Sequence, residues 1–259
     1  MSRCPASRFT LATSPFRHAA FPFPTPSSRQ MKPDVGVIIV AAGSGSRTGS
    51  KELKQFRWVA GKPMLLHSIQ TFQAVAEVAM VVCVLPREHV GDPPPWIFQS
   101  DSDRLLLSVG GRHRSESVAN GLEDLPTECE IVVIHDAARP LVSSETIARV
   151  IEEARKGNGA VAALPVSDTL KRVDSSGNVV VTVDRFGLWR AQTPQAFPRK
   201  AIERAHREAR EADRVATDDA ALCEQIGLPV VVVRGSERAL KITEENDFAL
   251  AEALSIFRE

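Results

Sequence analysis

Two basic residues, Arg47 and Lys54, stand in a short glycine-rich segment directly after an apolar run, Val35–Ala42. The glycines Gly43 and Gly45 carry no Cβ, so backbone N–H groups there can approach an anion closely. Two positive charges in the same segment add electrostatic attraction. Together these residues predict a cradle for a polyanion, most simply a nucleoside triphosphate, although an ordinary strand and loop with surface basic residues would give a similar pattern.

A dinucleotide site is a weaker interpretation of the same segment. The glycines Gly43, Gly45 and Gly49 do not have the GxGxxG spacing, and Lys51 adds further charge to the loop. A nicotinamide cofactor usually requires a neutral turn that leads at once into a helix, whose N-terminus binds the pyrophosphate. The segment therefore favours a triphosphate over a dinucleotide.

The elements that must position this loop alternate between strands and helices. Apolar runs rich in Val and Ile predict buried strands at residues 35–42, 78–85, 105–109, 131–135, 159–166 and 228–233. Apolar residues at helical spacing predict helices that begin near residue 63 and after residue 110, and others at 144–156, 199–211, 217–225 and 244–257. Thr243 is the expected N-cap of the last one. This alternation predicts an α/β fold with a mostly parallel, twisted sheet flanked by helices.

Three unusual loops should meet at one edge of that sheet. They are Gly43–Lys54, Gly110–Ser117 and Asp136–Arg139, each after a predicted strand. In open α/β sheets, ligands bind beyond the carboxyl ends of the strands. A hairpin is predicted at residues 168–183, as part of an arm at about 168–189. A two-stranded ribbon is marginally stable alone, so we expect it to pack against a second subunit.

Bulk properties narrow the class of protein. The chain has 259 residues, with 43% hydrophobic and 25% charged residues and a net charge of zero, as in ordinary globular enzymes. Nothing in this balance favours nucleic acid or an anionic membrane as a partner. No apolar run reaches the ~18 residues of a membrane-spanning helix. The four cysteines (Cys4, Cys83, Cys129 and Cys223) form no CxxC pair, which favours free thiols in a reducing compartment such as the cytoplasm.

The first 33 residues form a separate segment. They contain arginines and serines but no acidic residue before Asp34. Such a composition suits an organelle transit peptide, which would place the protein in a plastid. The alternative, which we favour, is an upstream start codon with Met31 as the true start in a bacterial, cytoplasmic protein. In either case we expect residues 1–33 to be disordered and residues 34–259 to form the folded domain.

An ordered set of short motifs resembles the nucleotidyltransferases, and more narrowly the 2-C-methyl-D-erythritol 4-phosphate cytidylyltransferase family. The matching stretches cover the chain from Val35 to the last helix: Ala41–Arg47, Lys54–Phe56, Gly110–Gly111 with Arg114 and Ser117, His135–Pro140, Asp168–Lys171, Thr182–Trp189, Thr193–Gln195, Thr217–Asp219 and Lys241–Thr243. Leu53 and Arg112 depart from the family pattern. The resemblance implies a Rossmann-like nucleotidyltransferase fold.

The resemblance also implies a reaction and a set of site residues. The family transfers CMP from CTP to 2-C-methyl-D-erythritol 4-phosphate and releases pyrophosphate, in the non-mevalonate route to isoprenoid precursors. The implied residues that neutralise the triphosphate are Arg47, Lys54 and Lys241. The implied nucleotide-binding residues are Ala41, Ala42, Gly43, Gly45, Gly110, Gly111, Ser117 and Asp136. Magnesium is the expected cofactor, with Asp136 as a tentative ligand, directly or through water.

On the acceptor side, the resemblance implies contacts from Arg139, Thr169, Arg185 and Thr193. Thr169 and Arg185 lie on the arm and would come from the neighbouring subunit of a homodimer. Two plainer interpretations stay open: a loop salt bridge for Arg139, and an ion pair between Arg185 and Asp184.

Helix capping is a plainer interpretation of Asp218 and Asp219 than a catalytic role. Two other functions also remain open. One is a cytidylyltransferase that acts on ribitol 5-phosphate, and the other is a nucleotide-binding protein without catalysis.

Overall fold

A computed structural model of the chain describes residues 32–43, 53–214 and 216–257. The description below concerns the compact unit Lys32–Glu259. The described residues do not include residues 1–31 of the predicted N-terminal extension. They also do not include Gly45 and Arg47. Within the described ranges, no helix is both long enough and apolar enough to cross a membrane.

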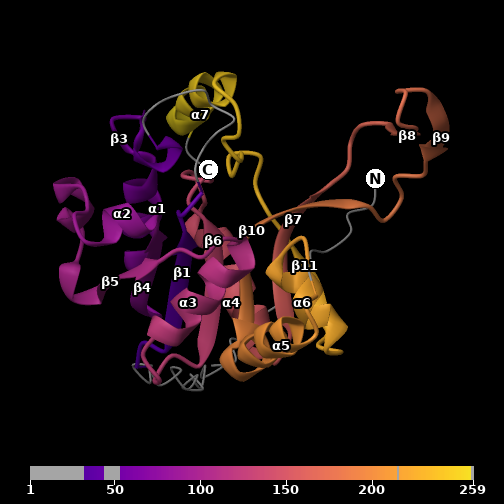
Figure 1. Cartoon of the computed structure of the whole chain (residues 1–259). Helices are drawn as coiled ribbons and strands as arrows, with labels where there is room; N and C mark the ends of the chain where they lie inside the picture. The colour runs from indigo at the N-terminus through magenta and orange to yellow at the C-terminus, as the bar shows by residue number, and fades with distance from the viewer. Residues whose placement is uncertain (1–31, 44–52, 215, 258–259) are drawn as a thin grey trace, which may run out of the picture. The chain divides into compact units, whose positions relative to one another are not determined.

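The described part of the unit is built on a mixed sheet of seven strands (Figure 1). In sheet order β11-β7-β10-β6-β1-β4-β5, the strands are β11 (Val230–Arg234), β7 (Gly159–Pro165), β10 (Trp189–Pro198), β6 (Ile131–Asp136), β1 (Val35–Val40), β4 (Val78–Leu85) and β5 (Leu105–Val109). All neighbours pair in parallel except β10, which is antiparallel to both β6 and β7. The expected α/β fold with a mostly parallel sheet is confirmed.

Helices cover both faces of the sheet. They are α1 (Met64–Gln73), α3 (Arg114–Asp124), α4 (Ser144–Arg155), α5 (Arg199–Glu211), α6 (Asp219–Gln225) and α7 (Asn246–Ile256). Alternate residues of β1 point to opposite faces, as a strand requires. Val37 and Ile39 pack in the same buried cluster as residues of α1 and α4, whereas Ile38 packs with residues of α3, α5 and α6. The segment between β4 and β5 contains the short helix α2 (Arg87–Val90).

Strand register brings the loops together at one edge. Val40, the last residue of β1, pairs with Asp136, the last residue of β6. The next residues continue the alignment, because Ala137 N donates to Val40 O at 3.1 Å and Ala41 N donates to Val84 O at 2.9 Å. The carboxyl ends of β1, β4 and β6 therefore stop at the same level, where the glycine loops begin.

The sequence did not predict β10, although this strand lies inside the sheet between β6 and β7. Its residues include Gln192, Thr193 and Pro194, which are typical of loops rather than buried strands. The register against β7 shifts between Ala191 and Gln195, and the Thr193–Pro194 bond within this irregularity is cis. A bulge of this kind lets proline enter a sheet without removing a ladder hydrogen bond.

The structure corrects two further expectations. The apolar run at 228–233 forms β11, but this is an edge strand with Val232 47% exposed rather than a buried strand. Thr243 is not the N-cap of the last helix, because α7 begins at Asn246 after Glu245. Instead, Asp247 Oδ2 accepts hydrogen bonds from the backbone N–H groups of Thr243 and Glu244 at 2.7 and 2.9 Å.

The predicted hairpin is present as a separate two-stranded sheet, β8 (Leu170–Val173) and β9 (Val179–Val183). Figure 1 shows it at the end of a long extension that β7 and β10 carry away from the seven-stranded sheet. The side chain of Asp174 fixes its turn by accepting from the N–H groups of Ser176 and Asn178, both at 2.9 Å. Its apolar side chains are exposed within this single chain.

Candidate functional site

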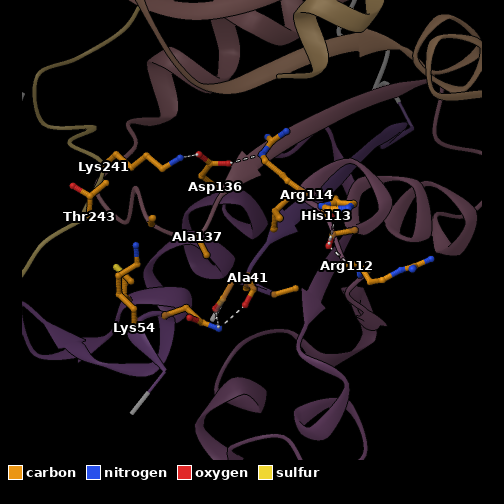
Figure 2. A pocket seen from close by; sticks show the side chains of 17 residues that line it. Ala41, Lys54, Arg112, His113, Arg114, Asp136, Ala137, Lys241 and Thr243 are labelled. Atoms are coloured by element: carbon orange, nitrogen blue, oxygen red, sulfur yellow. Dashed lines mark hydrogen bonds and ion pairs between the residues drawn. The ribbon is translucent and has the colours of Figure 1, made fainter. Parts of the chain in front are cut away.

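A cavity of about 480 Å³ opens at the carboxyl ends of β1 and β6 (Figure 2). The structure brings most of the residues expected at a nucleotide site to its walls: Ala41, Ala42, Gly43, Lys54, Gly111, Ser117, Asp136 and Lys241. Gly110 lines a smaller neighbouring cavity of about 280 Å³ together with Ala42 and Gly111. The loops that the sequence places at one edge of the sheet therefore do enclose a common space.

The two lysines reach the cavity from segments far apart in the chain. Lys54 opens a short 3₁₀ turn, and its Nζ donates to the carbonyl of Ile242 at 2.7 Å. The next residue, Gln55, is buried and donates to the carbonyl of Ala41 at 2.6 Å. Figure 2 shows Lys54 and Lys241 on the side of the cavity away from Arg112. Lys54 and Gln55 thus connect the segment before α7 to the end of β1 at the edge of the cavity.

Asp136 is the only acidic residue on the described walls of the cavity. Its side chain is mostly buried, with Lys241 Nζ 2.7 Å from Oδ2 and Arg114 Nε 3.2 Å from Oδ1. Burial by itself would raise the pKa of Asp136, but the charges of Arg114 and Lys241 outweigh it and hold the pKa well below its ordinary value. Asp136 is therefore ionised and holds two cations at the centre of the site.

Arg114 makes a second ion pair that the sequence did not predict. Its Nη1 lies 2.6 Å from Oδ2 of Asp219, whose side chain is 1% exposed. The other carboxylate oxygen of Asp219 lies 3.0 Å from His206 Nε2. The pKa of Asp219 is lowered, because Arg114 and His206 outweigh the effect of burial. Capping was correct for Asp218, which accepts from Ala221 N at 3.0 Å, but Asp219 has this different role. A helix start needs only one capping carboxylate. The presence of two consecutive Asp residues therefore indicated in the sequence that one of them, Asp219, has another role.

A second cavity, of about 260 Å³, adjoins the first. Both are lined by Arg114, Asp136 and Lys241, so this cluster of charges forms the boundary between them. Two residues expected on the acceptor side, Arg139 and Thr193, line the second cavity.

The guanidinium of Arg139 is partly unpaired. Nη1 donates to the carbonyl of Ala239 at 2.7 Å, whereas the buried Nε has no hydrogen-bond partner among the described residues. Burial lowers the pKa of Arg139. The described residues contain no salt bridge to Arg139, so they give no support to that plainer interpretation. A buried donor without a partner is costly, and an anionic ligand would satisfy it.

Thr193 and His135 are buried together between the two strands β6 and β10. Thr193 Oγ1 accepts a hydrogen bond from Asp136 N at 3.0 Å and lies 3.1 Å from His135 Nδ1. His135 Nε2 donates to the carbonyl of Arg139 at 3.1 Å. Burial lowers the pKa of His135 to about 4, so the ring is neutral.

The two residues expected from the arm do not reach either cavity within one chain. Thr169 and Arg185 are exposed, and Arg185 Nη1 donates to the carbonyl of Ser167. Asp184 forms no ion pair with Arg185 among the described contacts, and its Oδ1 instead accepts from Phe186 N at 3.0 Å.

The two departures from the family pattern are accommodated locally. Leu53 packs against the core. Arg112 has a side chain that is 89% exposed, while its backbone N–H donates to Glu116 Oε2 at 2.7 Å. Neither residue removes a charge from the centre of the site.

A polyphosphate suits the first cavity, with its two lysines, and a second anionic substrate suits the adjoining space beside Arg139. On this parallel α/β sheet, these features define the class of nucleotidyltransferases. The chain belongs to the 2-C-methyl-D-erythritol 4-phosphate cytidylyltransferase family, whose model matches residues 35–256.

Individual relatives agree with this assignment. The chain is 43% identical over 230 residues to the 2-C-methyl-D-erythritol 4-phosphate cytidylyltransferase of Syntrophus aciditrophicus, covering 86% of this chain and 96% of the relative. It is similar to the crystal structure of the enzyme of the same name from Thermus thermophilus, with a TM-score of 0.73, 36% identity and coverage of 86% of this chain and 100% of the other. A bifunctional enzyme of Desulfotalea psychrophila is 40% identical over 217 residues, which cover 55% of its length.

Proposed function

We propose that this protein transfers CMP from CTP to 2-C-methyl-D-erythritol 4-phosphate, with release of pyrophosphate, in the non-mevalonate route to isoprenoid precursors. One observation carries the proposal: Arg114, Asp136 and Lys241 line both a nucleotide-sized cavity and a smaller adjoining one. Two anionic substrates would therefore meet at a single cluster of charges. Family membership supports the choice of this nucleotide and this acceptor.

The reaction needs charge stabilisation more than proton transfer. A phosphate oxygen of the acceptor forms a bond to the α-phosphorus of CTP, and the bond from that phosphorus to the pyrophosphate oxygen breaks in line with it. The attacking oxygen already carries negative charge, so no general base is required. Lys54 and Lys241 supply positive charge next to the triphosphate, where negative charge spreads in the transition state. Asp136 holds Lys241 in place before substrate binds.

The cytosine would lie against the turn between β5 and α3. Ser117 Oγ accepts from Gly111 N at 3.1 Å and donates to the carbonyl of His113 at 3.2 Å, which holds this turn in one shape. A Cβ on Gly111 would lie 2.2 Å from Glu116 Cβ, so a larger residue does not fit. A tight turn with main-chain donors and acceptors supports recognition of a small pyrimidine.

Magnesium fits the site as an ion held mainly by substrate. The described residues contain no cluster of three or more His, Cys, Asp or Glu that could hold a metal. Among the described residues, Asp136 is the one carboxylate that lines the cavity, and both of its oxygens are paired with cations. A single carboxylate with phosphate and water ligands suits Mg²⁺, which seldom needs a complete protein cage. When bound, the ion would neutralise phosphate charge, with Asp136 as a direct or water-bridged ligand.

The acceptor phosphate would bind beside Arg139, whose buried Nε needs an acceptor. Thr169 and Arg185 would complete the acceptor site from a second subunit. The arm supports this proposal, because Val179, Val180 and Phe186 are 60%, 64% and 93% exposed in the single chain. Covering such apolar surface favours association into a homodimer.

A direct assay tests the acceptor. We expect pyrophosphate release from CTP and Mg²⁺ with 2-C-methyl-D-erythritol 4-phosphate, at a kcat/KM at least tenfold above that with ribitol 5-phosphate. Preference for ribitol 5-phosphate would overturn the choice of acceptor. Binding of CTP without turnover on either compound would overturn the enzymatic function itself.

Subunit mixing tests the contribution of the arm across the interface. Arg185→Ala and Lys54→Ala homodimers should each be nearly inactive, since each lacks one essential cation in both sites. In a mixed dimer, one site carries both substitutions and the other carries neither, so activity should recover partly. Absence of recovery after subunit exchange has been verified by mass spectrometry would contradict the shared site.

We also propose a cytoplasmic location. The relatives above come from bacteria, and the three described cysteines, Cys83, Cys129 and Cys223, are free and buried. Sequencing of the native N-terminus tests this proposal, since a start at Met31 would agree with it and a cleaved leader peptide would not.

A further inference from the structure

A chain of hydrogen bonds connects the end of β6 to the loop after it by way of β10. It runs from the backbone N–H of Asp136 to Thr193 Oγ1 at 3.0 Å, from there to His135 Nδ1 at 3.1 Å, and from His135 Nε2 to the carbonyl of Arg139 at 3.1 Å. His135 is 0% exposed and Thr193 is 4% exposed. Water therefore does not compete for these atoms.

The chemistry of the partners determines where two of the protons lie. A backbone N–H can only donate, so Thr193 Oγ1 accepts from Asp136. A carbonyl can only accept, so His135 Nε2 carries a proton. A hydroxyl can both donate and accept, so Thr193 Oγ1 also pairs with His135 Nδ1.

We propose that His135 is a positioning residue for the acceptor side of the site, acting through the proton on Nε2 and the hydrogen bond at Nδ1. The inference rests on the proposed function and deepens it. One ring nitrogen bonds to the hydroxyl of Thr193, which holds the backbone of Asp136. The other nitrogen holds the backbone of Arg139, and Arg139 lines the acceptor cavity. Phe72 packs edge-on against the ring with centroids 5.1 Å apart, which restricts its rotation.

Nitrogen NMR of the wild-type protein tests the proton assignment without any assay of activity. The six histidines are labelled with ¹⁵N, and the signals of His135 are identified by their loss in the His135→Phe variant. A proton on Nε2 is the expected result. A ring without a proton on Nε2 would overturn the proposal. This result stands even if the protein were inactive on the proposed acceptor, so the two failures are distinguishable.

Steady-state kinetics tests the positioning role. His135→Phe keeps an aromatic ring but removes both hydrogen bonds, and His135→Gln can keep one of them. We expect kcat/KM for the acceptor to fall by about 10- to 100-fold in the Phe variant and by less in the Gln variant. KM for CTP should change less than about twofold, because Lys54 and the turn near Gly111 remain intact.

A matched control is His67→Phe. The ring of His67 also contacts a carbonyl, that of Val59 at 2.7 Å, but lines neither cavity, so its loss should leave the kinetics unchanged. Thermal unfolding of all variants identifies any loss of folded protein. A His135→Phe enzyme with unchanged kinetics, or with equal effects on CTP and acceptor, would overturn the positioning role.

Discussion

Replacing Gly110 by alanine should weaken CTP binding indirectly, because Gly110 packs against Ala42, a residue that lines the nucleotide cavity. A Cβ on Gly110 would lie 2.2 Å from Ala42 Cβ and 3.1 Å from Leu85 O. Carbon atoms in contact normally lie ~3.5 Å apart or more, so the two methyl groups overlap by over ~1 Å. Gly110 cannot easily retreat, because its N–H donates to Leu85 O at 2.7 Å. Ala42 must therefore move, and it lines the nucleotide cavity.

The size of the effect follows from the overlap. Overpacking of a rigid site costs about 1–3 kcal/mol of the free energy of unfolding. For a chain of this size, about 1 kcal/mol corresponds to ~2–4 °C in melting temperature, so the Gly110→Ala protein should melt ~2–12 °C below wild type. If Ala42 is displaced in the folded protein, KM for CTP should rise by about tenfold, equivalent to ~1.4 kcal/mol. KM for the acceptor should change less.

Thermal unfolding and pyrophosphate release measure the two effects. Gly91→Ala is the matched control, because a Cβ on Gly91 meets nothing within 4 Å and Gly91 follows α2 in helical conformation. Its stability should stay within about 0.5 kcal/mol of wild type. If Gly110→Ala behaves like Gly91→Ala in both measurements, the close approach between Gly110 and Ala42 does not constrain the nucleotide site, and the reasoning fails.

Three further outcomes are expected. Lys241→Ala should lower kcat/KM for pyrophosphate release by about 100-fold or more, whereas Lys62→Ala, which removes a lysine outside the cavity, should not; a loss below fivefold for Lys241→Ala would contradict its role. Removal of divalent cations with EDTA should abolish turnover and added Mg²⁺ should restore it, unless the reaction proceeds without metal. For Asp219, the folded-state pKa is depressed below the unfolded value of about 3.9, so its contribution to stability is complete above that pH and is lost as pH falls through the folded-state pKa. In urea unfolding, the stability difference between wild type and Asp219→Asn should thus be constant from about pH 5 to 8 and shrink below pH 4, and a difference unchanged at pH 3 would contradict this.

Local sequence patterns predicted the α/β architecture, because strand and helix formation depend on periodic burial over a few residues. The run Val35–Ala42 contains no polar side chain on either face, so it predicted a strand that is covered on both faces of the sheet. Glycines and charges directly after that run, and Asp136 at the end of β6, predicted a ligand site at this edge of the sheet. The hairpin turn at Asp174 could also be predicted, since an Asp side chain there bonds to the backbone N–H groups of Ser176 and Asn178, two and four residues further along.

The order of strands in the sheet determined two features that local sequence patterns did not predict: the strand β10 and the exposure of β11. The residues of β10 resemble a loop, and only pairing on both sides with β6 and β7 makes them a strand. The apolar run of β11 predicted a strand, but its burial depended on whether another strand would cover it. Neighbours within a sheet are set by the long connections between strands, and a window of ten residues contains no information about them.

The chain by itself determined the kinds of residue at the site, and the tertiary structure decided their partners. Arg114 and Asp219 are far apart in sequence, as are Asp136 and Lys241, yet each pair is in contact. In the sequence, Asp219 stands at a helix start and is explained by capping. Only the structure shows that its carboxylate pairs with the guanidinium of Arg114. His135 had no visible role until β10 placed Thr193 beside it. Ion pairs and buried hydrogen bonds depend on distance in space, which residue spacing along a chain does not report.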